Sequence, residues 1–287
     1  MIDEDIRKGF LDMVNKNTMR CTREWSWIFC QDMPQAYGRK ISNILTHPNA
    51  EPFFYFADKV EKAFEYDCKK ARCNCEQHTW SSRRYGMIYR KDFNPYVSFG
   101  KEWTPPPLKE YYFKDINSDK PILVINNKYN EEWLKPPSNY LSLEFINKFI
   151  DTFKDKCKIY YIRYDNNSSS DGYFDDAKGY DFFDYKHPTL LKNVVTIYDY
   201  MNKHNVGYNE AQLEMMAQAK HIATVNGGNA VLSSYFGEDV IIYSSHKVLP
   251  ERGIWGTGSW LGLLSGSNII GCSNEKEMLG KCKERWL

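Results

Sequence analysis

The stretch His221-Ile-Ala-Thr-Val-Asn-Gly-Gly-Asn-Ala-Val-Leu-Ser-Ser-Tyr-Phe-Gly237 decides the fold of this chain. Residues 221–225 form a short apolar run typical of a strand buried on both faces, and a helix is expected from Asn229. Gly227 and Gly228 lie between the two elements, where the absence of a Cβ lets a ligand approach the backbone closely. Because the first N–H groups of a helix are unpaired and the helix dipole is positive there, this stretch predicts an anion-binding site.

Strand and helix patterns alternate regularly around this stretch. Short apolar runs predict further strands at residues 121–126, 158–163, 193–198, 240–243 and 267–271. Helical spacing of apolar residues predicts helices after Ser142, over 209–220, from Asn229 and over 274–286, with Ser142 as a cap and Asn209 and Gln212 spaced like a capping box. Strands that alternate with helices indicate parallel β–α–β units with right-handed crossovers, so we expect a Rossmann-like half.

The first part of the chain has a different pattern. Three consecutive prolines within Trp103-Thr-Pro-Pro-Pro-Leu108 exclude a helix and predict an extended linker, so we expect one domain over 1–115 and a second over 116–287. The pattern of the first domain predicts helices over 3–15, 35–45 and 57–72, and strands over 87–89 and 96–98. Its clustered aromatic residues, Phe53 to Phe56 among them, favour an aromatic core over an aromatic-lined cleft.

Composition excludes several classes of protein. With 287 residues, 42% of them hydrophobic and 16% aromatic, the chain is long and apolar enough for a packed core. The 38 basic and 37 acidic residues nearly cancel, to a net charge of +1, so we expect no nucleic-acid partner. The sequence has no apolar run of about 18 residues and its N-terminus is polar, so we expect a cytoplasmic protein without a transmembrane segment.

The 8 cysteines are spread along the chain, and without a secretory signal we expect them to be mostly reduced thiols. The densest group consists of Cys68, Cys73, Cys75 and His78, which offers three thiols and an imidazole to one metal ion. Structural zinc sites usually use two well-separated ligand pairs, and the gap between Cys73 and Cys75 is unusual for them. A helix end with incidental thiols is therefore favoured over a zinc site.

Candidate binding residues follow from the geometry of an open parallel sheet. Ligands bind such sheets at the carboxyl ends of the strands, near the point where the strand order reverses. Asn126 to Lys128 follow the first strand, Arg163 ends the second, and Asn226 to Asn229 end the glycine strand. A lysine, an arginine and a glycine-backed helix start that converge there would suit a diphosphate. In the plainer alternative, the lysine is solvated, the arginine pairs with a carboxylate and the glycines form a tight turn.

Two common nucleotide-binding motifs are absent from the sequence. Asn226-Gly-Gly-Asn-Ala-Val231 lacks the spacing of the dinucleotide fingerprint G-x-G-x-x-G and comes late in the predicted sheet. The P-loop motif G-x-x-x-x-G-K-[ST] does not occur anywhere in the chain. These absences disfavour NAD chemistry and kinase-type ATP chemistry.

Three segments of the second half resemble one family of enzymes. Residues 126–133, 207–213 and 224–237 are similar to the C-terminal half of GT-B type glycosyltransferases, notably small bacterial and large-DNA-virus members that build polysaccharides or glycans. The resemblance covers residues 118–287. It implies an α/β, GT-B-like fold, with a C-terminal Rossmann-like parallel sheet that holds a nucleotide-sugar and a smaller, partly helical α/β N-terminal domain on the acceptor side.

The resemblance also implies roles for the candidate residues. Backbone N–H groups of residues 227–229 would bind the donor diphosphate, and Lys128 and Arg163 would neutralise it as the leaving group departs. Glu210 would contact the sugar or the ribose, with a plain first-turn charge on a helix as an equal alternative. The full expected donor-binding set is Asn127, Lys128, Arg163, Glu210, Asn226, Gly227, Gly228, Asn229 and Ser233.

An inverting transferase also needs a base that accepts the proton of the acceptor hydroxyl. Asp32 is the chosen candidate, with His47 and Asp58 as rivals, and a solvated surface role is the alternative for all three. The metal-binding D-x-D motif of the other common glycosyltransferase architecture occurs only as Asp3-Glu-Asp5, outside its usual place after a strand. No metal and no other cofactor is therefore expected.

Together these features predict a metal-independent hexosyl- or pentosyltransferase. The enzyme would move a sugar from a UDP-sugar donor to a hydroxyl of a glycan acceptor, and similarity to viral enzymes suggests xylose as one donor sugar. A nucleotide-sugar epimerase and a noncatalytic nucleotide- or glycan-binding module are the alternatives.

Overall fold

The computed structural model describes residues 17–21, 26, 28–47, 49–62, 88–116, 118–129, 137, 139–165, 182–187, 189–245 and 253–287. The chain divides into two compact units, Met1–Pro106 and Pro107–Leu287, and the boundary falls within the three consecutive prolines. The helix expected over 3–15 lies outside the described residues. None of the helices in the described ranges combines the length and the apolar character needed to cross a lipid bilayer.

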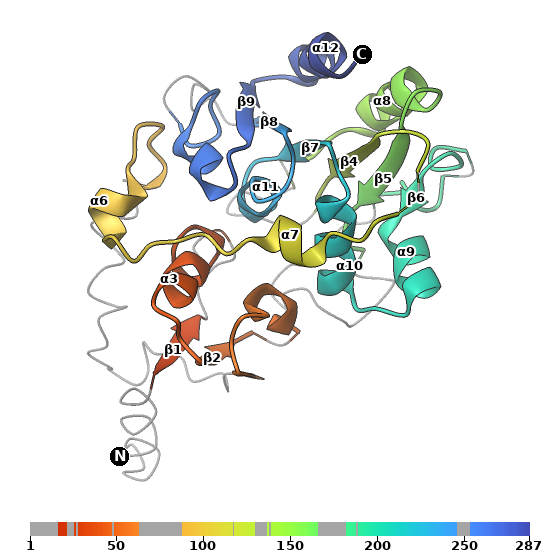
Figure 1. Cartoon of the computed structure of the whole chain (residues 1–287). Helices are drawn as coiled ribbons and strands as arrows, with labels where there is room; N and C mark the ends of the chain where they lie inside the picture. The colour runs from red at the N-terminus through yellow and green to blue at the C-terminus, as the bar shows by residue number, and fades with distance from the viewer. Residues whose placement is uncertain are drawn as a thin grey trace. The chain divides into compact units, whose positions relative to one another are not determined.

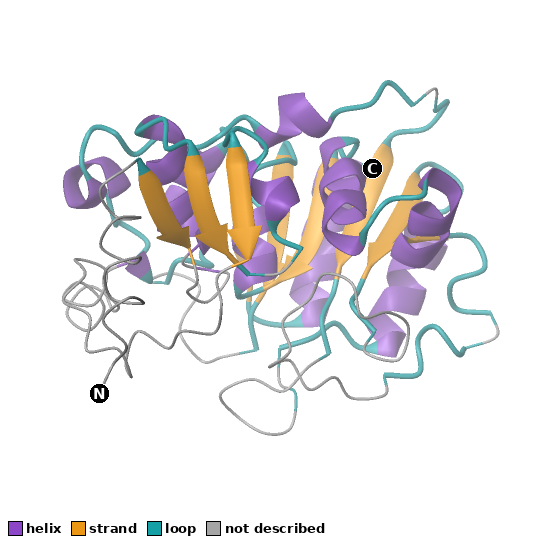
Figure 2. Cartoon of the chain, turned by 90° about the horizontal axis from the view of Figure 1, so that it is seen from below, coloured by secondary structure: helices purple, strands orange, loops and turns teal. Residues whose placement is uncertain are grey.

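The second unit is built on a parallel sheet of 6 described strands (Figure 1, Figure 2). In chain order these are β4 Ile122–Asn126, β5 Lys158–Ile162, β6 Val195–Thr196, β7 His221–Val225, β8 Asp239–Tyr243 and β9 Asn268–Cys272. Their order in the sheet is β6-β5-β4-β7-β8-β9, which corresponds to the 3-2-1-4-5-6 order of doubly wound nucleotide-binding folds. The predicted Rossmann-like parallel sheet is therefore confirmed.

Helices cover both faces of this sheet. Those described are α7 Leu108–Tyr112, α8 Leu143–Phe153, α9 Ile197–His204, α10 Tyr208–Ala217, α11 Gly228–Ser233, the 3-10 helix η3 Trp260–Leu264 and α12 Glu275–Trp286. Phe149 of α8 and Met278 of α12 share one buried cluster with Leu123 and Ile125 of β4. Because crossovers are right-handed and the strand order reverses between β4 and β7, α9 and α11, which pack on β5 and β7, cover the opposite face.

The central strands and their helix caps follow directly from the sequence. Every residue of β4 and β7 is buried, as their continuous apolar runs predict. Ser142 Oγ accepts a hydrogen bond from Phe145 N at 3.1 Å, which confirms Ser142 as the cap of α8. The Ser142 hydroxyl also donates to Oε2 of Glu275 at 2.7 Å, so the starts of α8 and α12 are held together.

Two detailed expectations for the second unit are wrong. The strand expected over 193–198 shrinks to the 2 residues of β6, because Thr196 and Asp199 form a capping box that starts α9 immediately. The capping pair expected at Asn209 and Gln212 does not cap α10. The N-cap residue there is a glycine, and Gln212 Nε2 instead donates to Asn209 Oδ1 at 2.8 Å within the helix.

The first unit contains a small parallel sheet with strand order β1-β2-β3. Its described elements are β1 Thr18–Cys21, the π-helix η1 Ile28–Asp32, α3 Met33–Gly38, β2 Asn43–Thr46, the 3-10 helix η2 Glu51–Phe54, β3 Lys59–Lys62 and α6 Pro95–Phe99. Phe53 and Phe54 are buried, and the buried Trp103 donates its Nε1–H to the Cys30 carbonyl at 2.8 Å. Aromatic side chains thus fill part of this core.

Both helices expected in the middle of the first unit are wrong in part. The helix predicted over 35–45 ends at Gly38, because the chain turns at Lys40, whose φ is 56°, and then enters β2. Residues 59–62 of the helix predicted over 57–72 form β3 instead, since they pair with β2. Non-local strand pairing here outweighs local helix propensity.

The strand expected over 96–98 is also wrong, because these residues lie in α6. Asn94 Oδ1 accepts hydrogen bonds from Tyr96 N at 3.0 Å and Val97 N at 3.2 Å, and Pro95 occupies the first turn. An Asn cap followed by proline is a helix start, and this signal outweighs the strand propensity of Tyr and Val.

A buried histidine joins the last turn of α12 to the sheet. The His221 ring stacks on Trp286, with 5.1 Å between the centroids and 12° between the planes. His221 Nδ1 lies 3.5 Å from Oδ2 of Asp239, whose Oδ1 accepts from Arg285 Nη2 and from Asn268 Nδ2, each at 2.9 Å. Burial lowers the pKa of His221 despite the opposing effect of Asp239, so the fold favours the neutral ring.

We expect acid to destabilise the protein through His221. A histidine whose pKa is lowered on folding contributes stability above its unfolded pKa of about 6.5, and that stability is lost as the pH falls toward the folded value. His221→Phe keeps a ring for the stack but cannot take a proton. Its free energy of unfolding in urea should therefore fall less than that of the wild type between about pH 7.5 and about pH 5.5.

The matched control for this prediction is His204→Phe, which replaces an exposed histidine at the end of α9. This variant should lose stability with acid as the wild type does. An equal acid loss in the His221→Phe variant and in the wild type would contradict the prediction.

Candidate functional site

The strand order of the second unit reverses between β4 and β7. The two strands pair in parallel, with Asn126 opposite Thr224, so their carboxyl ends lie at the same edge of the sheet. The chain continues from β4 to β5 on one side and from β7 to β8 on the other. Open α/β sheets bind ligands at such a reversal, so the residues that follow β4 and β7 are the candidates.

Asn126, the last residue of β4, holds the first turns of α11 in place. Its Oδ1 accepts a hydrogen bond from Asn229 Nδ2 at 3.1 Å, and its Nδ2 donates to Ser233 Oγ at 3.2 Å. Asn229 Nδ2 also donates to the Asn127 carbonyl at 3.3 Å. Asn126 and Ser233 are buried, so this set of hydrogen bonds holds α11, near its start and at its last residue, against the end of β4.

Lys128 places an ammonium group beside the same helix start. A Cβ atom added to Gly227 would lie 2.9 Å from Lys128 Nζ, so the ammonium packs over this glycine. Gly227 has φ 103° and ψ −156°, a conformation open essentially to glycine alone. Gly228 begins α11, whose first N–H groups lack partners within the helix. The ammonium and these N–H groups make the position electropositive and suited to an anionic ligand.

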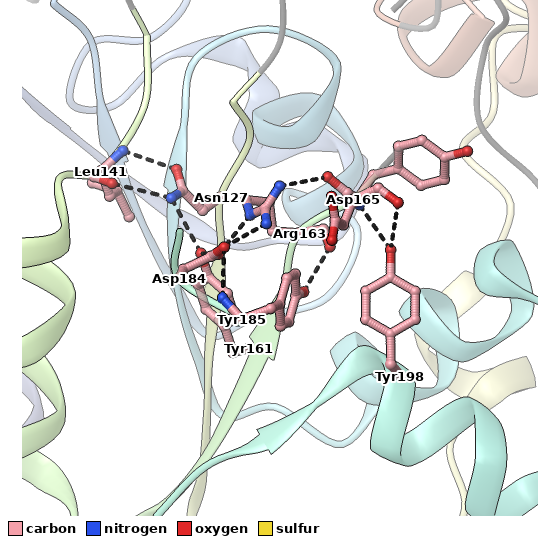
Figure 3. Close-up of polar contacts among 9 residues, drawn as sticks. Asn127, Leu141, Tyr161, Arg163, Asp165, Asp184, Tyr185 and Tyr198 are labelled. Carbon is pink, nitrogen blue, oxygen red and sulfur yellow. Dashed lines mark hydrogen bonds and ion pairs between the residues drawn. The ribbon is translucent and has the colours of Figure 1, made fainter. Parts of the chain in front are cut away.

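Asn127 and Asn226 serve as supports for the loops of this edge. Asn127 Oδ1 accepts from Leu141 N at 2.8 Å, and Asn127 Nδ2 donates to the Leu141 carbonyl at 3.1 Å (Figure 3). Asn226 Nδ2 donates to Ser244 Oγ, directly after β8, at 2.8 Å. Both amides are buried and make these hydrogen bonds within the protein.

Arg163, directly after β5, is committed to a buried ion pair (Figure 3). Its Nε donates to Asp184 Oδ2 at 2.5 Å, its Nη2 donates to Asp184 Oδ1, and its Nη1 donates to the Tyr164 carbonyl at 2.9 Å. Asp184 also accepts from Tyr161 OH at 2.6 Å and from Tyr185 N at 2.8 Å. The alternative in which Arg163 pairs with a carboxylate is the one observed, and each of its three guanidinium nitrogens donates a hydrogen bond within the protein.

The charges of this pair are stabilised inside the protein. Burial acts to lower the pKa of Arg163, but its hydrogen bonds to Asp184 raise the pKa overall, so the guanidinium stays charged. Burial and then the negative charge of Asp184 raise the pKa of Tyr161 well above its usual value, which keeps the hydroxyl as a donor. Tyr161 OH also accepts from Asn127 Nδ2 at 3.4 Å. A hydrogen-bonded chain thus connects the end of β4 to the end of β5.

Glu210 lies at the first turn of α10, on the β5 side of this edge. It is half-buried, and Tyr208, the first residue of α10, packs edge-on against Tyr164 just after β5, with 5.3 Å between the centroids. The start of α10 therefore packs near the end of β5, while Lys128 and Gly227 follow β4 and β7. A contact to a sugar or ribose stays a prediction.

The three candidate bases belong to the first unit. Asp32 is fully buried at the end of η1, His47 is half-buried after β2, and Asp58 is exposed before β3. An enclosed carboxylate reaches an acceptor hydroxyl only after a rearrangement, so exposure favours His47 and Asp58 over Asp32. The identity of the catalytic base stays a prediction.

Sequence reasoning did not find Asp184, Tyr161 and Tyr185, which determine what Arg163 does. Tyr161 belongs to an apolar run in the sequence. Such a run indicates a strand, but it does not indicate a role for the tyrosine hydroxyl. Asp184 stands between aromatic residues in Phe182-Phe-Asp-Tyr185, and an acid in such surroundings is a weak signal for a buried charge that needs a partner.

Comparisons with protein-family models, with curated proteins and with solved structures give no match to this chain. Within the described ranges, no group of three or more His, Cys, Asp or Glu side chains is placed to hold a metal ion. The group of Cys68, Cys73, Cys75 and His78 lies outside those ranges, so the choice between zinc and incidental thiols stays open.

We expect the loss of Asp184 to be severe. Asp184→Ala leaves the Arg163 guanidinium buried without its counter-ion, and breaking a buried pair from one side costs about 3 to 5 kcal/mol. The double variant Arg163→Met with Asp184→Leu removes both charges and should regain part of that stability, while the Tyr161 hydroxyl and the Tyr185 N–H still lose their acceptor. Urea unfolding of the two variants measures the difference.

Asp151→Ala, at an exposed position on α8, is the control and should stay within about 0.5 kcal/mol of the wild type. If the double variant is as unstable as Asp184→Ala, the unpaired charge is not the cause of the loss.

Proposed function

We propose that this chain is a GT-B type glycosyltransferase that binds a UDP-sugar at the carboxyl ends of β4 and β7. The observation that carries the proposal is the position of Gly227 and Lys128 at the reversal of a 3-2-1-4-5-6 sheet. Many nucleotide-using proteins share such a sheet. The resemblance of residues 126–133, 207–213 and 224–237 to GT-B enzymes supports glycosyl transfer among them.

In this proposal the positive groups of the site act on the donor diphosphate. The backbone N–H groups of Gly228 and Asn229 bind phosphate oxygens, and the Lys128 ammonium offsets the charge that grows on UDP as its bond to the sugar breaks. The acceptor hydroxyl of a glycan attacks the anomeric carbon of the sugar and gives its proton to a base. Because Lys128 supplies the neutralising charge, the transfer is proposed to need no metal.

Arg163 has an indirect role in this proposal. Its ion pair with Asp184 holds Tyr161, and Tyr161 accepts from Asn127, the residue before Lys128. The arginine therefore helps to place the loop that carries the lysine, and it does not itself bind the phosphates.

We expect Lys128→Ala to weaken UDP binding about 10- to 100-fold, because a hydrogen bond to a charged group contributes about 1.5 to 3 kcal/mol. Calorimetric titration with UDP measures the change. Lys283→Ala, at an exposed position in the last turn of α12, removes the same charge elsewhere and should bind UDP as the wild type does. Unchanged affinity in Lys128→Ala would rule out this diphosphate site.

A turnover assay tests the reaction itself. UDP-glucose, UDP-galactose, UDP-xylose and UDP-N-acetylglucosamine are offered with a panel of glycan acceptors, with and without a chelator. Release of free UDP that requires an acceptor and survives the chelator is the expected result. Conversion of one UDP-sugar into another without an acceptor would indicate an epimerase, and binding without any turnover would indicate a noncatalytic module.

A further inference from the structure

Lys128 is held through both of its neighbours in the chain by one further segment. On one side, the Asn127 amide exchanges two hydrogen bonds with the backbone of Leu141, at 2.8 and 3.1 Å (Figure 3). On the other side, the Tyr129 ring packs edge-on against Tyr140, with 4.7 Å between the centroids and 87° between the planes. The segment therefore contacts the chain just before and just after the lysine.

The other end of this segment is bonded to the loop after β8. Asn139 is buried, and its Oδ1 accepts hydrogen bonds from the Ser245 hydroxyl at 2.6 Å and from the Ser245 N–H at 3.3 Å. One residue earlier, Ser244 Oγ accepts from Asn226 Nδ2 at 2.8 Å. Because Asn226 directly precedes Gly227, the loop after β8 joins this segment to the glycine of the candidate site.

These contacts form a closed circuit that begins and ends at the lysine. The Lys128 ammonium packs over Gly227 and so closes the circuit. A fully bonded network of this kind restricts the motion of its members, because none of them can shift without loss of a contact elsewhere. In order, the circuit consists of Lys128, Asn127, residues 139–141, Ser245, Ser244, Asn226 and Gly227.

The sheet itself positions the glycine side of this circuit but not the lysine side. The Asn226 N–H donates to the Tyr243 carbonyl at 2.9 Å, so strand pairing extends to the residue before Gly227. Lys128 lies two residues beyond the end of β4, in neither a strand nor a helix. Its ammonium is carried on a flexible four-carbon stem. Contacts outside the sheet, those of its two chain neighbours among them, therefore place the lysine.

We propose that Asn139 is a positioning residue for the diphosphate site, and that its bond to Ser245 keeps the Lys128 ammonium over Gly227. The inference rests on the proposed function, in which the diphosphate binds at this lysine and this glycine. Charge-assisted hydrogen bonds need the correct distance and direction, so a shift of the lysine backbone weakens them without removal of any group that touches the ligand. Asn139 acts through Lys128 and does not itself touch the ligand.

Two variants break the link between Asn139 and Ser245. Asn139→Ala removes the acceptor. Ser245→Ala removes the closer donor at an exposed residue, so it tests the link even if Asn139→Ala does not fold. Each variant should weaken UDP binding about 2- to 10-fold, the loss expected for one hydrogen bond. Ser245→Thr keeps the hydroxyl and should bind UDP as the wild type does.

The same substitution in the Lys128→Ala background separates positioning of the lysine from a general loss of structure. Calorimetric titration should show that Ser245→Ala lowers UDP affinity in the wild type but not in Lys128→Ala, because the group that the link positions is then absent. Asn268→Ala is the control. It removes a hydrogen bond to Asp239 at the opposite, amino end of the sheet and should bind UDP as the wild type does.

Two results would overturn the positioning role alone. One is equal UDP affinity of the wild type, Asn139→Ala and Ser245→Ala. The other is an equal loss of affinity from Ser245→Ala with and without Lys128. In both cases the proposed function stands as long as Lys128→Ala weakens UDP binding. If the wild type does not bind UDP, the proposed function fails and the inference fails with it.

Discussion

The buried side-chain amide of Asn126 joins α11 to the end of β4. A side-chain amide offers both an acceptor and a donor, and Asn126 uses its oxygen for Asn229 and its nitrogen for Ser233. Buried polar groups are costly to leave unpaired, so this arrangement holds two positions of the helix against the end of β4. Gly227 is the N-cap of that helix, and the Lys128 ammonium lies beside Gly227.

The end of β5 is held by a buried ion pair instead of a side-chain amide. Arg163 and Asp184 neutralise each other out of contact with water, and such a pair adds little net stability but strongly penalises any arrangement that separates its partners. The pair is thus better suited to fixing positions than to stabilising the fold. It fixes Asn127 through Tyr161.

Local signals in the sequence were sufficient for the central strands and the α8 cap of the second unit, and insufficient for the strand pairing of the first. β4 and β7 are continuous apolar runs, and Ser142 is a cap, so each is readable from a few adjacent residues. β3 reads Lys-Val-Glu-Lys and becomes a strand only by pairing with β2, which no local pattern reports. The candidate site also has one part that the sequence predicts and one part that it does not. The residues at the strand ends could be predicted from the order of the strands. The partner of Arg163 could not, because Asp184 lies 21 residues away in a segment without helix or strand periodicity.

The ends of β4 and β7 differ in how soon a helix follows the strand. This difference accounts for a sheet that has the dinucleotide-binding strand order but lacks the dinucleotide fingerprint. In that family the phosphate binds a helix that starts directly after the first strand. Here the first described helix after β4 is α8, which starts at Leu143, and the loop after Asn126 carries Asn127, whose amide is bonded to Leu141. After β7, by contrast, α11 starts at Gly228, only a short turn beyond Val225. Among the described residues, close approach of a phosphate to a helix start is therefore possible at β7 and not at β4. In the proposed function the diphosphate is therefore bound on the β7 side of the edge, and not after β4 as in the dinucleotide-binding proteins.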